Sequence, residues 1–197
     1  LLCQKRGARH WKKLKENSDN PRKEITIGLA TKYFKSGDYD LADSYVSVVE
    51  ALKHAGAQLK TKVKIKWLDC EEELNFEGIS GLIVPQGWGS RGVEGKIAAV
   101  KFARENNVPY LGLCFGMQMA VIEFARNVAG LKGANSVEVD PKTKYSVIAL
   151  MKDQEKYLAK HQYGGTIRLG AWPAVIDKKS LLFKLYGTDK VSERHRH

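Results

Sequence analysis

Cysteine is scarce in this sequence, which has only Cys3, Cys70 and Cys114. The three form an odd and widely spaced set, with neither a Cys-x-x-Cys pair nor the ligand spacing of a zinc site. This scarcity excludes a small disulfide-stapled scaffold and predicts a reducing, cytoplasmic location. It also gives no reason to expect a metal ion.

Long hydrophobic runs are missing as well. No apolar stretch approaches the roughly 20 residues that a membrane-spanning helix needs, and no signal-peptide pattern is present, so we expect no membrane contact. Hydrophobic residues are 43% and charged residues 28% of the 197 residues, as in soluble globular domains. This length and composition predict one well-buried α/β core.

The formal net charge of +11 is concentrated at one end of the sequence. Residues 1–23 carry eight basic and two acidic side chains, a net charge of +6, and end in the turn-forming stretch NSDNPRK. The other residues lack a dense stripe of basic side chains interleaved with aromatic ones, so nucleic acid is not an expected partner. We therefore interpret residues 1–23 as a basic linker, solvated or facing a partner, with a turn in place of secondary structure at NSDNPRK.

Strand and helix patterns alternate after this segment. Short apolar runs predict strands at 24–30, 62–69, 78–85 and 108–114. Amphipathic spacing predicts helices at 43–56, where Gly56 supplies the stop, and at 93–107 and 115–128. This alternation predicts the α/β class, with a mostly parallel central sheet flanked by helices. After residue 140 the pattern weakens, and we expect strands at 145–151 and 166–176 and a short helix at 180–187.

Cys114 lies where an apolar strand pattern gives way to a helical one. Gly112 and Gly116 flank it, which makes G-x-C-x-G, the cysteine counterpart of the G-x-S-x-G nucleophile elbow. Glycine suits both positions because the elbow strains the backbone and leaves no space for side chains. Open α/β sheets bind ligands at the carboxyl ends of their strands, so this turn is a candidate active site.

The start of the following helix adds chemistry to the turn. Its unpaired N–H groups and dipole favour a thiolate at Cys114, and the N–H of Phe115 can stabilise an oxyanion. Gln118 lies one helical turn further on and can reach a substrate bound at the sulfur. The rest of this helix is apolar nearly all round, which predicts burial. The alternative is that Cys114 is a small buried hydrophobic residue.

A second glycine-rich turn, VPQGWGSRGVEG at 84–95, also joins a strand to a helix. In a parallel sheet it would stand beside the Cys114 turn, where the amide of Gly87 could be the second oxyanion donor. The turn matches neither G-x-x-x-x-G-K-[ST] nor G-x-G-x-x-G, so we do not expect it to bind a nucleotide. The alternative is a tight turn that needs glycine only for backbone freedom.

Several stretches resemble one family. The sequence from Val84 to Glu138, above all RGVEGKI and GMQMAVIEFARNV, closely resembles the class I glutamine amidotransferase domains of the CTP synthase family. ITIGLATKY and DSYVSVVEALKHAG are similar to that family's first strand and helix, and GGTIRLGAWPAV and ERHRH to its later segments. The resemblance implies a flavodoxin-like glutamine amidotransferase domain over residues 24–197, with residues 1–23 linking it to a preceding synthetase domain.

The resemblance also implies an activity. Such a domain hydrolyses L-glutamine through a cysteinyl thioester, and the ammonia passes to a synthetase domain that converts UTP to CTP with ATP. Carried over by motif, Cys114 is the nucleophile and the amides of Gly87 and Phe115 form the oxyanion hole. The implied substrate-binding residues are Gly87, Phe115, Gly116, Met117, Gln118, Glu138 and Arg196. No cofactor is expected in this domain, since ATP and Mg²⁺ belong to the synthetase domain; GTP activation and a homo-tetramer are implied for the whole enzyme.

Two departures from the family stand out. Gln86 occupies a position where the family usually has glycine, and Trp88 one where it has phenylalanine, so either could alter the oxyanion hole. No His-x-Glu occurs in these 197 residues, and we expect the family's catalytic His-Pro-Glu to lie beyond ERHRH. His195 and His197 could be mistaken for that base, but we do not expect either to serve, because a base must reach the sulfur and be oriented by a third group. We expect His10 in the N-terminal segment, His54 at the end of a helix and His161 in a polar stretch. We therefore expect little steady turnover from residues 1–197 alone.

Two other functions stay open from the sequence. One is a generic α/β cysteine hydrolase that acts on esters or small amides. The other is a catalytically incomplete module that acts through a partner-binding surface.

Overall fold

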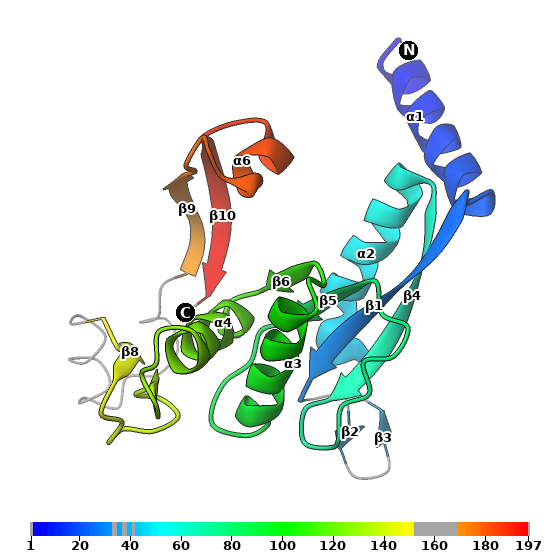
Figure 1. Cartoon of the computed structure of the whole chain (residues 1–197). Helices are drawn as coiled ribbons and strands as arrows, with labels where there is room; N and C mark the ends of the chain where they lie inside the picture. Colours follow the sequence, from blue (N-terminus) through cyan, green and yellow to red (C-terminus); the bar gives the residue numbers. More distant parts are fainter. Residues whose placement is uncertain (1, 33–34, 37–38, 41, 152–168, 197) are drawn as a thin grey trace. The chain divides into compact units, whose positions relative to one another are not determined.

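The computed structural model describes the chain except residues 1, 33–34, 37–38, 41, 152–168 and 197 (Figure 1). The chain divides into two compact units, Leu1–Ala149 and Leu150–His197, which we call the first and second units. The first unit contains Cys114 and both glycine-rich turns. No helix in the described ranges has the length and hydrophobicity needed to cross a membrane.

A four-stranded parallel sheet forms the centre of the first unit. Its strand order is β4–β1–β5–β6, where β1 is Lys23–Thr31, β4 is Thr61–Asp69, β5 is Gly81–Val84 and β6 is Tyr110–Gly112. In the register of β5 and β6, Val84 pairs with Gly112, so both strands end at the same edge. The predicted parallel sheet is therefore confirmed, and so is the placing of its first four strands.

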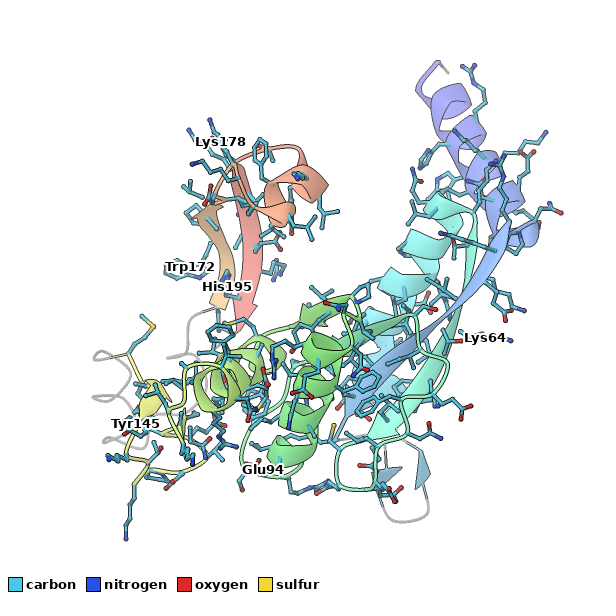
Figure 2. The ribbon with its side chains drawn as sticks, viewed as in Figure 1. Lys64, Glu94, Tyr145, Trp172, Lys178 and His195 are labelled. Carbon is cyan, nitrogen blue, oxygen red and sulfur yellow. The ribbon has the colours of Figure 1, made fainter. Side chains whose placement is uncertain are left out.

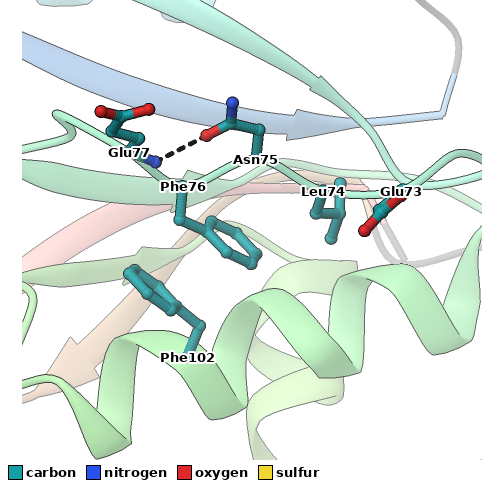
Figure 3. Close-up of a pocket in the computed structure, with 6 residues that line it drawn as sticks. All are labelled: Glu73, Leu74, Asn75, Phe76, Glu77 and Phe102. Atoms are coloured by element: carbon teal, nitrogen blue, oxygen red, sulfur yellow. Dashed lines mark hydrogen bonds between the residues drawn. The ribbon is translucent and has the colours of Figure 1, made fainter.

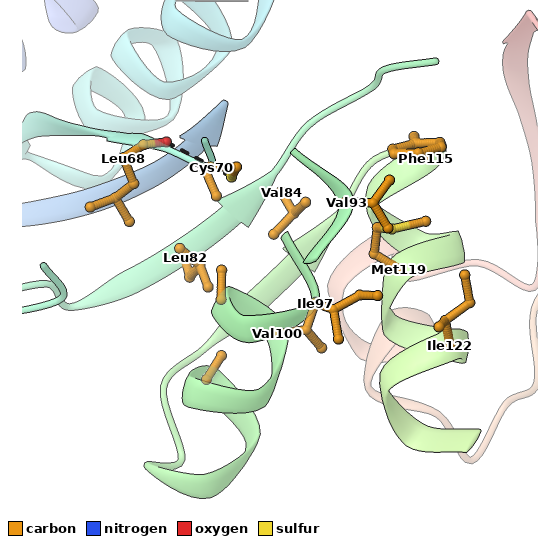
Figure 4. Packing of buried hydrophobic residues seen from close by; sticks show 13 residues of the cluster. Leu68, Cys70, Leu82, Val84, Val93, Ile97, Val100, Phe115, Met119 and Ile122 are labelled. Atoms are coloured by element: carbon orange, nitrogen blue, oxygen red, sulfur yellow. Dashed lines mark hydrogen bonds between the residues drawn. The ribbon is translucent and has the colours of Figure 1, made fainter. Parts of the chain in front are cut away.

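Helices cover both faces of this sheet. The helix α2 (Val46–Leu59), preceded by a short 3₁₀ turn (Ala42–Tyr45), packs on one face, where Leu29 and Ile83 contact Tyr45 and Val48. The helices α3 (Val93–Glu105) and α4 (Phe115–Asn127) pack on the other face. Figure 4 shows the core between them and the sheet, built from side chains such as Leu82, Val84, Ile97, Met119 and Ile122.

Charged pairs join α3 to α4 beside this core. The guanidinium of Arg104 donates to both carboxylate oxygens of Glu123, with Nη2 2.8 Å from Oε1 and Nε 3.0 Å from Oε2. The Glu123 side chain is only 1% exposed. Arg126 Nη1 lies 2.9 Å from Oε2 of Glu94, which is labelled on α3 in Figure 2. Because the Arg104–Glu123 pair is bidentate and its carboxylate is buried, it tolerates little displacement and helps to fix α4 relative to α3.

Short strands complete the two units. The pairs β2 (Lys35–Ser36) with β3 (Tyr39–Asp40), antiparallel, and β7 (Asn135–Ser136) with β8 (Ser146–Ile148), parallel, belong to the first unit. The second unit pairs β9 (Leu169–Val175) with β10 (Lys190–Arg196), antiparallel, and carries the helix α6 (Leu181–Tyr186) between them. The Ser180 hydroxyl caps α6 by accepting from the N–H of Phe183 at 3.1 Å. The strand and helix predicted at 166–176 and 180–187 are confirmed in their described parts.

The prediction for the basic segment is wrong in its secondary structure. A helix, α1 (Leu2–Asp19), includes the first three residues of the NSDNPRK stretch. The turn covers only residues 20–22, because β1 begins at Lys23. Charges one turn apart stabilise α1, since Lys15 Nζ lies 2.5 Å from Asp19 Oδ2. The turn-forming residues of NSDNPRK therefore do not end the helix before Asp19. The interpretation as a linker between domains stays a prediction.

Two further helix predictions need correction. The helix α2 continues through Gly56 to Leu59. Glycine is needed at position 56 because the chain packs closely there: a Cβ would lie 2.5 Å from the Thr61 carbonyl oxygen. The helix α4 is not buried all round. Its Met119 and Ile122 side chains are fully buried, whereas Met117 and Phe124 on the opposite side are 51% and 55% exposed. Apolar composition alone does not tell a buried helix from one with an apolar exposed face.

The start of α4 generates a stability prediction. A Cβ on Gly116 would lie 1.8 Å from the carbonyl oxygen of Val84, which is backbone and cannot move aside. Helix propensity alone predicts that Gly116→Ala stabilises the protein by about 1 kcal/mol. We expect the opposite sign, a loss of about 2–4 kcal/mol in the free energy of unfolding, measured by urea titration.

The matched control is Ala98→Gly on the exposed side of α3, which should cost only the propensity difference of about 1 kcal/mol. A Gly116→Ala protein as stable as wild type would show that α4 does not lie this close to β5.

Candidate active site around Cys114

The backbone of Cys114 is strained in the way that the elbow prediction requires. Cys114 is the N-cap of α4 and has φ of 54° and ψ of −105°. A side chain rarely adopts such a positive φ unless the surrounding structure holds it there. Both flanking glycines are necessary, because a Cβ on Gly112 would lie 2.7 Å from the Met117 nitrogen and one on Gly116 would meet Val84. The strand–turn–helix elbow is therefore confirmed.

The thiol of Cys114 is accessible, unlike that of Cys70. Cys114 is half-buried, and the backbone N–H of Phe115 acts to lower the pKa of its thiol. Cys70 is 5% exposed, and burial raises the pKa of its thiol to about 12. The alternative that Cys114 is only a core residue therefore does not fit, whereas it fits Cys70 well.

The surroundings of Cys114 shift its pKa in the direction opposite to the predicted one. Burial raises the pKa of Cys114 above the ordinary value for a thiol. The hydrogen bond from Phe115 lowers the pKa, as predicted for a helix N-terminus, but it does not offset burial. The carboxylate of Glu138 raises the pKa further, and the ammonium of Lys96 lowers it. The raised pKa disfavours the thiolate, so a proton acceptor would assist Cys114 in acting as a nucleophile.

The second glycine-rich turn lies beside the first, as predicted. It begins after β5, and a Cβ on its Gly87 would lie 3.5 Å from Cδ1 of Phe115. Gly87 is buried, so its backbone lines the space next to the start of α4. The structure thus brings together Gly87 and Phe115, the two residues predicted to supply oxyanion donors.

Glu138 joins the same site from a loop after β7. Its Oε1 accepts a hydrogen bond from the N–H of Gly89 at 2.6 Å, and its own N–H donates to Ser136 Oγ at 3.1 Å. Its carboxylate also raises the pKa of Cys114. Hydrophobic periodicity would make Glu138 a solvated loop charge, so only the family motif could have found it.

Gln118 carries an orphaned polar atom. Its Oε1 is buried and has no hydrogen-bond partner among the described residues. Its backbone N–H donates to the Cys114 carbonyl at 3.2 Å, so it stands one turn from the sulfur. A buried acceptor without a partner costs about 1–3 kcal/mol, and a bound ligand with a donor would remove that cost. This supports the predicted role of Gln118 in ligand binding.

Two buried lysines belong to the site and were missed from the sequence. Lys32, directly after β1, is 2% exposed, and Lys96, on α3, is fully buried. The ammonium of Lys96 donates to the Pro85 carbonyl at 3.0 Å, and that of Lys32 donates to the Trp88 carbonyl. A signal existed for Lys96, because it falls at helical spacing from Val93 and Val100 on the buried face of α3.

The departures from the family pattern lie in this turn. Gln86 is half-buried and Trp88 is 48% exposed. Trp88 holds the turn through its backbone carbonyl, which accepts from Lys32. This contact does not depend on which side chain residue 88 carries. The effect of Gln86 on the oxyanion hole stays a prediction.

The remaining predicted residues lie on α4, in the second unit or outside the described residues. Met117 is on the first turn of α4. Arg196 and His195 belong to β10 of the second unit, where His195 Nδ1 is 2.9 Å from the Glu193 carbonyl; Figure 2 labels His195. Their roles stay predictions. His161 and His197 are outside the described residues, and His54 does not close α2, which ends five residues later.

A separate hollow lies next to α3 (Figure 3). It has a volume of about 660 Å³ and is lined by Glu73, Leu74, Asn75, Phe76, Glu77 and Phe102. The rings of Phe76 and Phe102 stack with centroids 4.1 Å apart, which anchors the loop before β5. Its lining contains neither cysteine nor histidine and shares no residue with the Cys114 site, so it is not a second nucleophilic centre. In the described ranges no three His, Cys, Asp or Glu side chains are grouped as metal ligands.

Comparison with known proteins points to one family. The family described as Glutamine amidotransferase class-I matches residues 40–197. The CTP synthase of Methanocaldococcus jannaschii is 50% identical over 199 aligned residues, which cover 95% of this chain and 35% of that protein. The CTP synthase of Bacillus subtilis is 48% identical over 203 residues, covering 100% of this chain and 36% of that protein.

A solved structure agrees with these sequences. It is described as the glutaminase domain of Trypanosoma brucei CTPS with bound acivicin. It superposes with a TM-score of 0.75 at 36% identity, covering 88% of this chain and 66% of that one. The chain spans about a third of the length of the curated relatives that it matches. With a parallel sheet, a strained cysteine elbow and this match over most of its length, the chain belongs to the class-I glutamine amidotransferase family.

Proposed function

We propose that this chain is the glutaminase part of a CTP synthase. In this proposal it hydrolyses L-glutamine and delivers ammonia to a synthetase domain of the same polypeptide, which converts UTP to CTP with ATP. The observation that carries the proposal is the cysteine elbow, where a strained Cys114 faces the amide of Phe115 and lies beside the turn of Gly87. The identity of about 50% to proteins named CTP synthase supports CTP synthesis as the use of the ammonia.

The reaction follows from the donors at the elbow. A base removes the proton from Cys114, and the sulfur attacks the carboxamide carbon of glutamine. The oxygen becomes an oxyanion that accepts from the amides of Phe115 and Gly87. The C–N bond breaks as nitrogen takes a proton and leaves as ammonia, which leaves a glutamyl thioester. Water then adds to the thioester carbonyl, glutamate departs, and the thiol is restored.

Two acceptors are suited to the amino group of the substrate. The carboxylate of Glu138 and the orphaned Oε1 of Gln118 can both accept from an α-ammonium group. The backbone of Gly116 and Met117 in the first turn of α4 would line the substrate beside them. The family resemblance assigns the α-carboxylate to Arg196, because a guanidinium matches that group in charge and geometry; this role stays a prediction.

The base is needed because burial raises the pKa of Cys114. In this proposal it is the histidine of the family's His-Pro-Glu, oriented by the glutamate. The remaining expectations belong to the whole enzyme: a cytoplasmic location, ATP and Mg²⁺ in the synthetase domain, activation by GTP and a homo-tetramer. Residues 1–23, which include α1, would connect the two domains.

The first test of this function replaces the nucleophile in the full-length protein. We expect Cys114→Ser to lower glutamine-dependent ammonia release at least about 1,000-fold, because a hydroxyl is a far weaker nucleophile at this site. CTP formation from added ammonia should continue, since that chemistry lies in the synthetase domain.

Cys70→Ser is the matched control and should retain glutamine hydrolysis within about fivefold, since the buried Cys70 packs against Gly92 and Gly95 rather than against Gly87. An aryl ester serves as the competing substrate. Wild-type protein that releases phenol from the ester but no ammonia from glutamine would replace this proposal by a generic cysteine hydrolase.

The second test uses the charge of Glu138. Because its carboxylate raises the pKa of Cys114, Glu138→Gln should move the pH profile of Cys114 alkylation by iodoacetamide to lower pH. The side-chain oxygen of glutamine can still accept from Gly89. Alkylation is measured for each cysteine-containing peptide by mass spectrometry, so that Cys3 and Cys70 do not interfere.

Asp140→Asn, two residues further along the same loop, should leave the profile in place. An unchanged profile in Glu138→Gln, or a shift to higher pH, would show that the carboxylate does not face the sulfur.

A further inference from the structure

The turn that carries Gly87 is held on both sides by buried ammonium groups. Lys96 reaches it from α3 and donates to the Pro85 carbonyl at 3.0 Å. Lys32 reaches it from the end of β1 and donates to the Trp88 carbonyl. These two carbonyls belong to the peptide groups before Gln86 and after Trp88, so the peptide that carries the Gly87 N–H lies between two fixed peptides.

The peptide after Trp88 is held at both of its polar ends. Its carbonyl accepts from Lys32, and its N–H, that of Gly89, donates to Glu138 at 2.6 Å. Lys32 is itself fixed through its backbone, since its N–H donates to the Tyr45 hydroxyl at 3.2 Å and its carbonyl accepts from Arg91 at 3.1 Å. Lys32 therefore connects the turn to Tyr45 in the core of the first unit.

The same lysines lie near the aromatic ring of Phe115, the other residue proposed to supply an oxyanion donor. Lys32 Nζ lies 5.2 Å and Lys96 Nζ 5.5 Å from the centroid of the Phe115 ring. A Cβ on Gly87 would lie 3.1 Å from Cε of Lys32 and 3.5 Å from Nζ of Lys96. Cations at these distances interact favourably with an aromatic ring. Gly87, Phe115 and the two ammonium groups are thus packed as one cluster.

Two buried lysines at this turn lower the stability of the folded protein, so folding by itself does not explain them. Two buried ammonium groups are desolvated and repel each other, and burial lowers the pKa of Lys96 to about 8. An apolar side chain of similar length would fill the same space without those costs. Gly87 has no side chain to restrict its backbone, so without the two contacts the peptide that carries its N–H could rotate.

We infer that Lys32 and Lys96 are positioning residues for the oxyanion hole, which hold the Pro85 and Trp88 carbonyls so that the Gly87 N–H keeps its catalytic orientation. This inference rests on the proposed glutaminase function. Neither lysine contacts the reacting atoms in this account. Their effect falls on the tetrahedral oxyanion, and so on kcat for glutamine.

The test compares Lys96→Met with Lys101→Met in the full-length protein. Methionine keeps the length of the side chain and removes the ammonium, whereas Lys101 lies exposed on the same helix and pairs only loosely with Glu105 at 4.0 Å. Lys96→Gln is a conservative variant, since its amide can still donate to Pro85. The measurements are kcat and KM for glutamine, the melting temperature, and the rate of Cys114 alkylation by iodoacetamide at its high-pH plateau. That alkylation forms no oxyanion.

We expect Lys96→Met to lower kcat at least about tenfold, a fraction of the loss seen when an oxyanion donor is removed outright. KM and the plateau alkylation rate should stay within about twofold of wild type, and Lys96→Gln should fall between the two. Lys32→Met should act in the same direction as Lys96→Met, and Lys101→Met should match wild type.

A kcat within twofold of wild type in Lys96→Met overturns the inference. So does an equal fall in kcat and plateau alkylation, which would mean general distortion of the site, and so does failure of both lysine variants to fold, which would mean a structural anchor. Wild-type protein that releases no ammonia from glutamine would instead remove the proposed function, and the inference with it.

Discussion

The contact on which the site depends is the approach of α4 to the end of β5. A Cβ on Gly116 would lie 1.8 Å from the Val84 carbonyl oxygen, so only glycine lets the helix start this close to the strand. That approach places the Cys114 turn beside the turn that follows Val84, and it forces the chain through the strained φ of 54° at Cys114. The Arg104–Glu123 pair holds α3 and α4 together around it. The chemistry proposed at the sulfur requires this geometry.

Much of the fold could be predicted because its signals are local. The apolar runs of β1, β4 and β5 and the amphipathic spacing of α3 and α4 determine a parallel α/β sheet without knowledge of any contact. The same pattern located the elbow, since it put G-x-C-x-G between a predicted strand and a predicted helix. The N-terminal helix α1 was not predicted, because NSDNPRK is rich in turn-forming residues and because the packing of α1 against α2 is a contact that the sequence does not show.

The finer properties of the site depend on contacts between distant residues, and the sequence does not reveal them. The expected low pKa of Cys114 came from the helix N-terminus alone, whereas burial and the charge of Glu138 act in the opposite direction. Lys32 and Lys96, which contact the Gly87 turn, are 64 residues apart in sequence, and neither matches an active-site motif. Gln118 was found by its spacing, but its orphaned oxygen is visible only in three dimensions. A site of this kind combines a motif with supporting residues that carry no local signal.

The central claim is that the sulfur of Cys114 forms a covalent bond with the side-chain carbonyl of glutamine. The most direct measurement is rapid acid quenching of the full-length protein during turnover, followed by mass spectrometry of the Cys114 peptide. The account predicts a glutamyl adduct on Cys114 that forms with L-glutamine, disappears when glutamine is exhausted, and does not form with D-glutamine. Steady release of ammonia with no adduct on Cys114 at any time point, or an adduct on another residue, would contradict it.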